Sequence, residues 1–311
     1  MSLDELKKLQ EEIIKKNRIC SIVGWLIFLI EVAITVFVFI KNDGFLFHAP
    51  IIIGFEVIFL IFVIVIMQNT MNGKNIKIFK KEFKNTFVKS SLQKYFDNLT
   101  YVYEKGFSEE FIESTGMIDT GDRFNSNDYI SGTYKDIKFE QSDIHIEEEH
   151  ESTDSDGNTT TTWVTTFEGR WMIFDFNKPF KANIQVASSY FGANYLANRR
   201  KYSKVRMDDT EFNKMFNVYA ESEHEAFYIL TPHFMEKIKN LKLKLNCNVM
   251  FCFIDNKLHI AINDYKDSFE YNVLKRINES EIEKEITKDI KVITDFVDEL
   301  NLDNDLFKEE N

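Results

Sequence analysis

The segment ICSIVGWLIFLIEVAITVFVFI, residues 19–40, is 22 residues long and its only charged side chain is Glu31. As an α-helix rising about 1.5 Å per residue it would be roughly 33 Å long, which matches a bilayer hydrocarbon core of about 30 Å. A signal peptide has a shorter apolar region, about 7 to 15 residues, and a small-residue cleavage site, which is missing here. We therefore predict a transmembrane helix.

A second apolar run, residues 50–67, has Glu56 as its only charge and follows the turn-forming residues 41–44, which end in Gly44. Together the two runs predict a transmembrane hairpin over residues 19–68. Because basic residues favour the cytoplasmic side, we expect both termini and residues 74–311 to lie in the cytoplasm, at the cell (inner) membrane. The basic flanks that support this orientation are Lys7, Lys8, Lys15, Lys16 and Arg18 before the hairpin and Lys74, Lys77, Lys80, Lys81, Lys84 and Lys89 after it.

The two intramembrane carboxylates, Glu31 and Glu56, both fall in the outer leaflet of such a hairpin. A carboxylate in hydrocarbon costs several kcal/mol, so it faces a partner or a cavity, or becomes protonated. One interpretation is a shared proton or a cation site, between copies in a homo-oligomer. The other, which we favour, is two protonated or snorkelling carboxyls that help the helices associate, because two helices alone do not form a transport path.

The charge of the chain is unevenly distributed. The total is −12 over 311 residues, while residues 1–90 carry 12 basic and 8 acidic side chains, a net +4, which leaves −16 for the remainder. We expect the positively charged residues next to the hairpin to contact anionic lipid headgroups, with a favourable free energy of about 1 kcal/mol per residue. The acidic remainder argues against nucleic-acid binding, which requires a basic face. The residues predicted to contact headgroups are Lys74, Lys77, Lys80, Lys81 and Lys84.

The cytosolic part predicts an α+β fold with an antiparallel sheet. Residues 1–18 form a cytosolic segment before the hairpin. Apolar residues from Ile76 to Tyr103 recur every three or four positions, with one step of five from Phe87 to Leu92, which indicates an amphipathic stalk helix over residues 74–105. An α+β domain follows over residues 106–272, and residues 273–311 form a C-terminal helix and an acidic tail.

Within that domain, alternating patterns predict strands, and turn residues separate them. Asp156-Gly157 and Asp255-Asn256-Lys257 are expected to close two hairpins. The apolar parity changes near Gln141, which predicts a bulge or a bend near this residue. Asp208 with Glu211 resembles a capping box for a short helix, and Thr231-Pro232 begins another. The predicted strands are 129–134, 137–149, 160–176, 184–187, 204–207, 243–254 and 258–262.

No metal or cofactor site is predicted. The acidic residues of the first hairpin could be a solvated tip, or a patch for a weak cation or a basic partner. An EF-hand loop beginning at Asp154 fails because Gly157 stands fourth rather than sixth and Thr165 replaces the bidentate Glu. Cys247 and Cys252 are an odd number of residues apart on a strand and face opposite sides. The patch residues are Glu147, Glu149, Asp154 and Asp156.

Several segments of the cytosolic part are similar to one known family. They are Phe167–Arg170, Glu211-Phe212, Phe216–Tyr219, Ala226–Pro232, Phe234-Met235 and the run DNKLHIAI from Asp255. Together they resemble the bacterial DUF3137 family, over most of residues 75–275. The resemblance implies a bacterial source and an N-terminal membrane hairpin, and it suggests a LemA-type membrane protein as a partner. It transfers no catalytic residue.

These patterns predict a membrane-anchored cytosolic binding or scaffold module. No metalloprotease, nucleophile-elbow or phosphate-loop spacing is present, so a non-enzyme is favoured without enzymatic activity being excluded. One alternative is an enzyme acting on a membrane-proximal substrate, which would need a deep pocket with convergent His and carboxylate groups. The other is a small ion- or proton-conducting membrane component.

Overall fold

The computed structural model describes residues 1–41, 49–153, 157–176, 179–189, 202–300 and 302. The chain divides into two compact units. The first contains residues 1–88 and 271–283, and the second contains residues 89–270 and 284–311. Each unit is described by itself.

The first unit is built on two long antiparallel helices, α1 (Leu3–Lys41) and α2 (Ala49–Phe83). Near the middle of α1, a Cβ added at Gly24 would lie 2.4 Å from Cγ1 of Ile64, so the missing side chain allows the helices to approach. Further along, Sγ of Cys20 lies 3.3 Å from Sδ of Met71. The amide of Asn72 donates to the carbonyl oxygen of Ile13.

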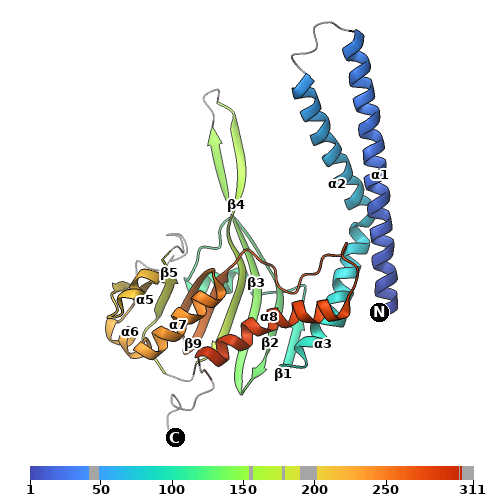
Figure 1. The fold of residues 1–311 in the computed structure, drawn as a ribbon. Coiled ribbons are helices and arrows are strands. Elements are labelled where there is room, and N and C mark those ends of the chain that lie inside the picture. Colours follow the sequence, from blue (N-terminus) through green and yellow to red (C-terminus); the bar gives the residue numbers. More distant parts are fainter. Residues whose placement is uncertain (42–48, 154–156, 177–178, 190–201, 301, 303–311) are drawn as a thin grey trace. The chain divides into compact units, whose positions relative to one another are not determined.

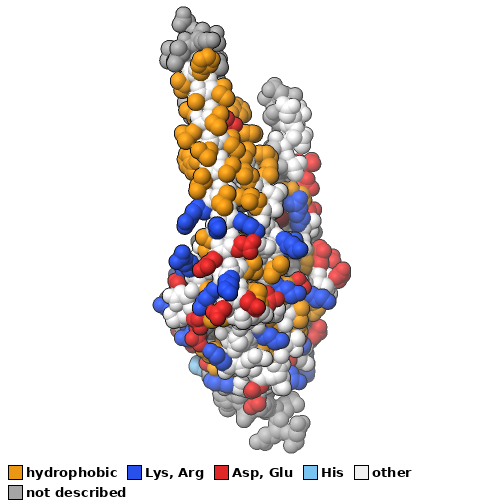
Figure 2. Space-filling model, turned by 90° about the vertical axis from the view of Figure 1, so that its right-hand side faces the viewer, with side chains coloured by type: hydrophobic (Ala, Val, Ile, Leu, Met, Phe, Trp, Pro, Cys, Tyr) orange, Lys and Arg blue, Asp and Glu red, His pale blue; other side chains and the backbone are white. Residues whose placement is uncertain are grey.

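The helix α1 is long and apolar enough to cross a membrane. Its segment Leu3–Phe37 has a mean hydropathy of 2.4 in the most apolar window, and only 11% of that window is buried, unlike the core helix of a soluble protein. The apolar part of α2, Gly54–Met67, qualifies only together with the helical segment Thr70–Leu92, from which it is bent by 53°. Figure 2 shows the hydrophobic side chains of these helices as a continuous surface, with lysines and arginines gathered where it ends.

The predicted stalk helix is confirmed to Leu92 and wrong beyond it. After α2 comes a π-helical turn, η2 (Lys84–Val88), and a short helix, α3 (Lys89–Leu92). The π-turn inserts one extra residue, so the buried apolar positions step by five from Phe83 to Val88, slightly before the step of five in the sequence pattern. Residues 97–102 form a strand, β1 (Asp97–Val102), because the segment NLTYV begins with Asn98 at a φ of 52° and continues with β-forming side chains.

The second unit is one antiparallel sheet in which the described strands follow the order β1-β2-β3-β4-β9-β8-β5-β7-β6 (Figure 1). Strands β3 and β4 are the longest and extend beyond their neighbours as a two-stranded hairpin. The remaining bounds are β2 (Arg123–Tyr134), β3 (Ile137–Thr153), β4 (Thr159–Asp175), β5 (Ile184–Ser188), β6 (Ser203–Val205), β7 (Phe216–Ala220), β8 (Asn248–Ile254) and β9 (Lys257–Asn263).

An irregularity does lie near Gln141, but its extra residue is in β2 and not in β3. The register of β2 with β3 shifts between the pairs Asn127–Asp143 and Ile130–Gln141, while pairing of β3 with β4 runs through Gln141 without a break. The apolar residues change from odd to even positions because β3 is buried on both faces. Phe139 and Gln141 lie on one face, and Ile144 and Ile146 lie on the other. The hairpin at Asp255-Asn256 is confirmed, with φ values of 50° and 57° that suit a two-residue turn.

Helices cover both faces of this sheet. On one face lie α7 (Pro232–Leu245) and α8 (Glu279–Leu300) (Figure 1), where Phe296 contacts the rings of Phe174 and Phe251. On the other face α4 (Glu109–Thr115) buries Ile112 against Trp171 and its neighbours. Two short helices follow β6 and β7: α5 (Thr210–Met215), capped by Asp209 rather than the predicted Asp208, and α6 (Glu223–Ile229).

Candidate functional site: a pocket beneath α4

A pocket of about 330 Å³ lies between α4 and the sheet. The N-cap Ser108, whose hydroxyl accepts from the amide of Phe111, begins the helix, and Gly116 with a φ of 60° ends it. The carbonyl of Gly116 accepts from the side chain of Gln185 on β5, which ties the end of the helix to the sheet. The pocket is lined by Phe107, Phe111, Ser114 and Thr115 on the helix side and by Glu140, Ile173, Ile254, Asp255, Lys257 and His259 on the sheet side.

His259 is the buried polar group of this pocket, with an exposure of 5%. The indole N–H of Trp171 donates to its Nδ1 at 3.4 Å, and the ring of Phe111 lies nearly parallel to it, 6.4 Å away. Because Nδ1 accepts, the proton of the neutral ring is on Nε2. Burial, with a smaller contribution from the charge of Lys257, lowers the pKa of His259 to about 4.

The polar groups at the rim have partners of their own. The ammonium of Lys257 lies 3.9 Å from the carboxylate of Glu140, which also accepts from the hydroxyl of Tyr129 at 2.8 Å. Asp255 stands in the hairpin turn beside them. On the helix, the hydroxyls of Ser114 and Thr115 donate to backbone carbonyls one turn earlier. The rim therefore holds one cation and two carboxylates around apolar walls.

This arrangement suits binding better than acid–base chemistry. A general base works best with a pKa near the operating pH, and that of His259 lies far below neutrality. Among the described residues no side chain accepts a hydrogen bond from Nε2, so its N–H is left for a ligand with an acceptor oxygen. The size matches small-molecule sites, which have apolar walls and few polar groups.

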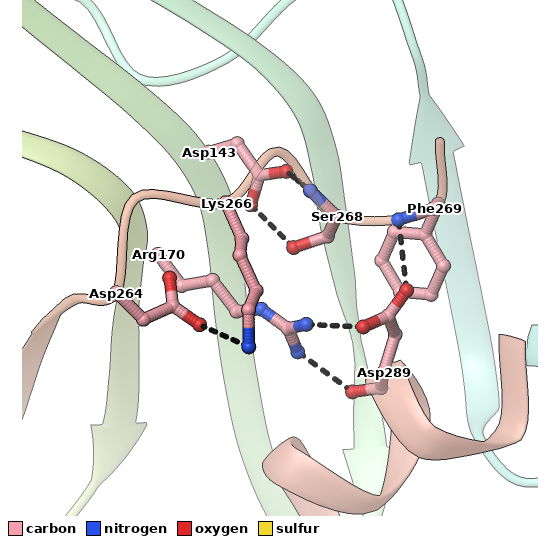
Figure 3. Close-up of polar contacts among 7 residues, drawn as sticks. All are labelled: Asp143, Arg170, Asp264, Lys266, Ser268, Phe269 and Asp289. Atoms are coloured by element: carbon pink, nitrogen blue, oxygen red, sulfur yellow. Dashed lines mark hydrogen bonds and ion pairs between the residues drawn. The ribbon is translucent and has the colours of Figure 1, made fainter. Parts of the chain in front are cut away.

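A second polar group of residues lies on the α8 side of the sheet (Figure 3). Arg170 of β4, with a side chain 4% exposed, donates to the carboxylate and carbonyl of Asp289 on α8. Asp143 accepts from the amide and hydroxyl of Ser268, and burial raises its pKa although Arg170 opposes the rise. Within the described ranges, Asp128, Asp143 and Asp267 bring carboxylate oxygens within 4.8 Å of one another.

This carboxylate cluster already has hydrogen-bond donors from the protein. The hydroxyl of Tyr101 donates to Asp128 at 2.6 Å, and the amide of Asn127 donates to both Asp128 and Asp267. These contacts join β1, the irregular part of β2 and the loop after β9. The arrangement could hold a cation, yet each carboxylate also has a structural role without one.

Residues 165–302 match the profile of a family described as protein of unknown function (DUF3137). This match assigns residues 165–302 to the DUF3137 family. No curated protein and no solved structure matches the chain. The DUF3137 region includes Trp171, Ile173 and His259 of the pocket, while α4 and Glu140 lie before it.

The predicted intramembrane pair lies outside the DUF3137 region, in the first unit. Glu31 and Glu56 line the same groove of about 310 Å³ between α1 and α2, with Phe55 and Phe59. The hydroxyl of Thr35 donates to one oxygen of Glu56, while the other oxygen is buried without a hydrogen-bond partner among the described residues. The structure thus brings the two glutamates together.

The predicted lysine row is only partly exposed. Lys74, Lys77, Lys80 and Lys81 are exposed on α2, but Lys84 is 3% exposed at the start of η2. The structure therefore separates Lys84 from the four exposed lysines, and the headgroup contacts expected of all five stay a prediction.

The predicted acidic patch of the β3–β4 hairpin has neighbours that the sequence pattern did not indicate. Glu147 lies 3.7 Å from the guanidinium of Arg123, which covers the ring of Trp163 at 3.3 Å. The backbone amide of Glu149 donates to Asp122. Asp154 and Asp156 lie outside the described residues.

The pocket beneath α4 was not predicted. Its residues come from four separate segments, and His259 entered only within the family-like run from Asp255. One signal could have pointed to it: on β9, the polar Lys257 and His259 share a strand face with Ala261 inside an otherwise apolar segment. A buried histidine on a central strand requires a hydrogen-bond partner.

Proposed function

We propose that the chain is a membrane-anchored, non-enzymatic binding module whose sheet unit takes up a small ligand beneath α4. The observation that carries the proposal is the neutral, buried His259, fixed by Trp171 between aromatic and aliphatic walls. Such a site favours a molecule with a flat apolar body and an uncharged acceptor oxygen, since the Nε2–H offers one donor and no charge.

The anchor in this proposal is the two-helix hairpin, with both termini and the sheet unit in the cytoplasm of a bacterial cell. The basic flanks of the hairpin support this orientation, and the lipid bilayer is the first partner. A LemA-type membrane protein or a second copy of the chain would make the module a scaffold. Protease digestion of right-side-out and inside-out membrane vesicles tests the orientation: the sheet unit should be digested only in inside-out vesicles.

Ligand binding is tested by adding 4-fluorobenzamide to the full chain in lipid nanodiscs. Binding is measured as broadening of the ¹⁹F NMR signal of 4-fluorobenzamide. The amide oxygen supplies the acceptor and the ring supplies the flat body. We expect the wild-type chain to broaden the signal. Ser114→Phe should remove the broadening because it fills the pocket with a ring, and His259→Phe should remove it because it deletes the N–H donor. Thr160→Phe, on the exposed hairpin, is the matched control. Equal broadening with the wild-type chain and Ser114→Phe would contradict the proposal.

The alternative of an enzyme is supported by one histidine and two carboxylates that line the pocket beneath α4. It is disfavoured by the low pKa of His259 and by the hydroxyls of Ser114 and Thr115, which donate to the backbone instead of to a base. An activated nucleophile needs a base within hydrogen-bond reach, and within the described part of the pocket these hydroxyls have none.

A second candidate function, a proton or cation conductor, is favoured by one observation. Glu31 and Glu56 share a groove, and one oxygen of Glu56 is buried without a partner. Flux through liposomes that contain the chain decides the matter. If the candidate holds, Glu31→Gln and Glu56→Gln lower the flux, with Thr70→Val as a control at another hydroxyl of α2. Flux equal to that of protein-free liposomes ends it.

A further inference from the structure

A second pocket, of about 470 Å³, opens where α7 ends and β8 begins. Asn246 ends α7 in the left-handed region, with a φ of 52°, and the chain turns directly into β8. The end of β9 lies beside it, because Asn248 pairs with Asn263. Polar side chains dominate the lining: Lys242, Asn246, Asn248, Asn263, Asp264 and Tyr265.

Lys242 is a partly buried cation without a counter-charge. Its ammonium donates to the hydroxyl of Ser188 at 2.9 Å and to the carbonyl of Cys247 at 3.3 Å, both uncharged. No carboxylate of the described chain lies within ion-pairing distance. Burial lowers its pKa. An ammonium has three donors, so one remains for an acceptor in the pocket.

The neighbouring lysines of the same helix show that this situation is particular to Lys242. Lys239 pairs with Asp209 and Glu236, each at 2.8 Å. Lys244 pairs with Asp295 at 2.8 Å and Glu299 at 3.5 Å. The lysine that lines the pocket is therefore the one of the three without a carboxylate partner in the described chain.

Asp264 supplies the opposite charge in the same pocket. One of its oxygens is buried without a hydrogen-bond partner among the described residues, and the other lies 3.9 Å from Lys266, whose side chain is 71% exposed. Burial raises the pKa of Asp264, against the charges of Arg170 and Lys266 (Figure 3) and against hydrogen bonds that the carboxylate accepts from the backbone amides of Asp264 and Lys266. A buried polar atom without a partner is costly and calls for an unseen ligand, water or ion.

We propose that this second pocket binds a small zwitterion of the α-amino acid class. The carboxylate of the ligand lies against Lys242, its ammonium group lies against Asp264, and the side-chain amides of Asn246 and Asn248 bond the remaining polar atoms. Both charges of the ligand then meet a group of the protein that lacks a full partner. The proposal is independent of the pocket beneath α4.

The test uses the full chain in lipid nanodiscs and each standard L-amino acid in turn, first by thermal shift and then by calorimetry for the strongest. The N-acetyl form and the amide of that amino acid each remove one charge. We expect each to bind at least about tenfold more weakly, which corresponds to about 1.4 kcal/mol. Equal binding of the N-acetyl form would show a plain anion site, and equal binding of the amide a plain cation site; either result overturns the proposal, as does the absence of binding by any amino acid.

Variants locate the site on the protein. Lys242→Met and Asp264→Asn should each weaken binding at least about tenfold, while Lys242→Arg should retain it. Lys244→Met, two residues further along α7 and outside the pocket, is the matched control. A near-UV circular dichroism spectrum equal to that of the wild-type chain confirms that Lys242→Met is folded. Unchanged amino-acid binding by Lys242→Met contradicts the proposal, whatever the outcome at the pocket beneath α4.

Discussion

Trp171 donates its indole N–H to Nδ1 of His259, and this contact joins two adjacent strands beneath α4. The pKa of His259 is about 4, below the usual 6.5. Between these pH values the imidazole is protonated in the unfolded chain and neutral in the folded chain. Stability is complete above pH 6.5 and falls as the pH decreases toward 4. The shift corresponds to roughly 3 kcal/mol at about 1.4 kcal/mol per pH unit.

We expect His259→Gln to remove this part of the pH dependence. Urea unfolding of the detergent-solubilised chain at several pH values, followed by near-UV circular dichroism, measures it as the difference from the wild-type profile. His224→Gln, at a side chain 89% exposed, is the control. Parallel profiles of the wild-type chain and His259→Gln would show that the buried imidazole does not set the pH response.

Arg170 and Asp289 form a mostly buried ion pair that fixes α8 on the sheet. The guanidinium contacts both the carboxylate and the carbonyl of Asp289, whose second oxygen accepts from the amide of Phe269. Removing one partner leaves the other charge buried, at a cost of about 3 kcal/mol or more. We therefore expect Asp289→Asn to lower the free energy of unfolding by that amount.

The control for this prediction is the exposed pair of Lys135 and Asp298, 2.8 Å apart. Surface pairs contribute about 1 kcal/mol or less, so Asp298→Asn should have a small effect. If Asp289→Asn lowers the free energy of unfolding as little as Asp298→Asn does, then α8 is held on the sheet by its apolar side chains alone.

Gly169 permits the close pairing of β4 and β9. A Cβ at this position would lie 2.1 Å from the carbonyl oxygen of Ile262, and the residue has a φ of 154°. Because the obstacle is backbone, Gly169→Ala must displace a strand, and we expect a loss of about 3 kcal/mol in chemical denaturation. Gly157→Ala meets no neighbouring atom and has only its φ of 85° against it, so its loss should be closer to 1 kcal/mol.

The elements that sequence reasoning predicted are those with a local pattern. The apolar run from Ile19, the β-forming segments of β3, β4 and β9, the turn at Asp255-Asn256 and the cap at Thr231 each depend on neighbours within a few residues. The end of the stalk helix was missed because β1 exists only through its pairing with β2. The parity change at Gln141 was misread because burial on both faces of a strand removes its alternation.

The candidate site could not be predicted for a different reason. Phe111 and His259 are far apart in the chain and meet only after α4 has packed on the sheet. The same holds for Lys242 and Asp264, whose local sequences resemble an ordinary helix end and a strand end. What distinguishes Lys242 is the absence of a counter-charge in the described chain, and that absence depends on tertiary neighbours.

The packing of α1 on α2 can be tested inside the membrane by a disulfide. Sγ of Cys20 lies 3.3 Å from Sδ of Met71, so Met71→Cys should crosslink to Cys20 when membranes are treated with an oxidant. Ile58→Cys, at an exposed position of α2, is the matched control and should not crosslink within one chain. Adding Gly24→Ile should reduce the crosslink, because even a Cβ at Gly24 would lie 2.4 Å from Cγ1 of Ile64 and would force the helices apart. Crosslinking of both cysteine variants to the same extent would show that α1 and α2 do not pack through this face.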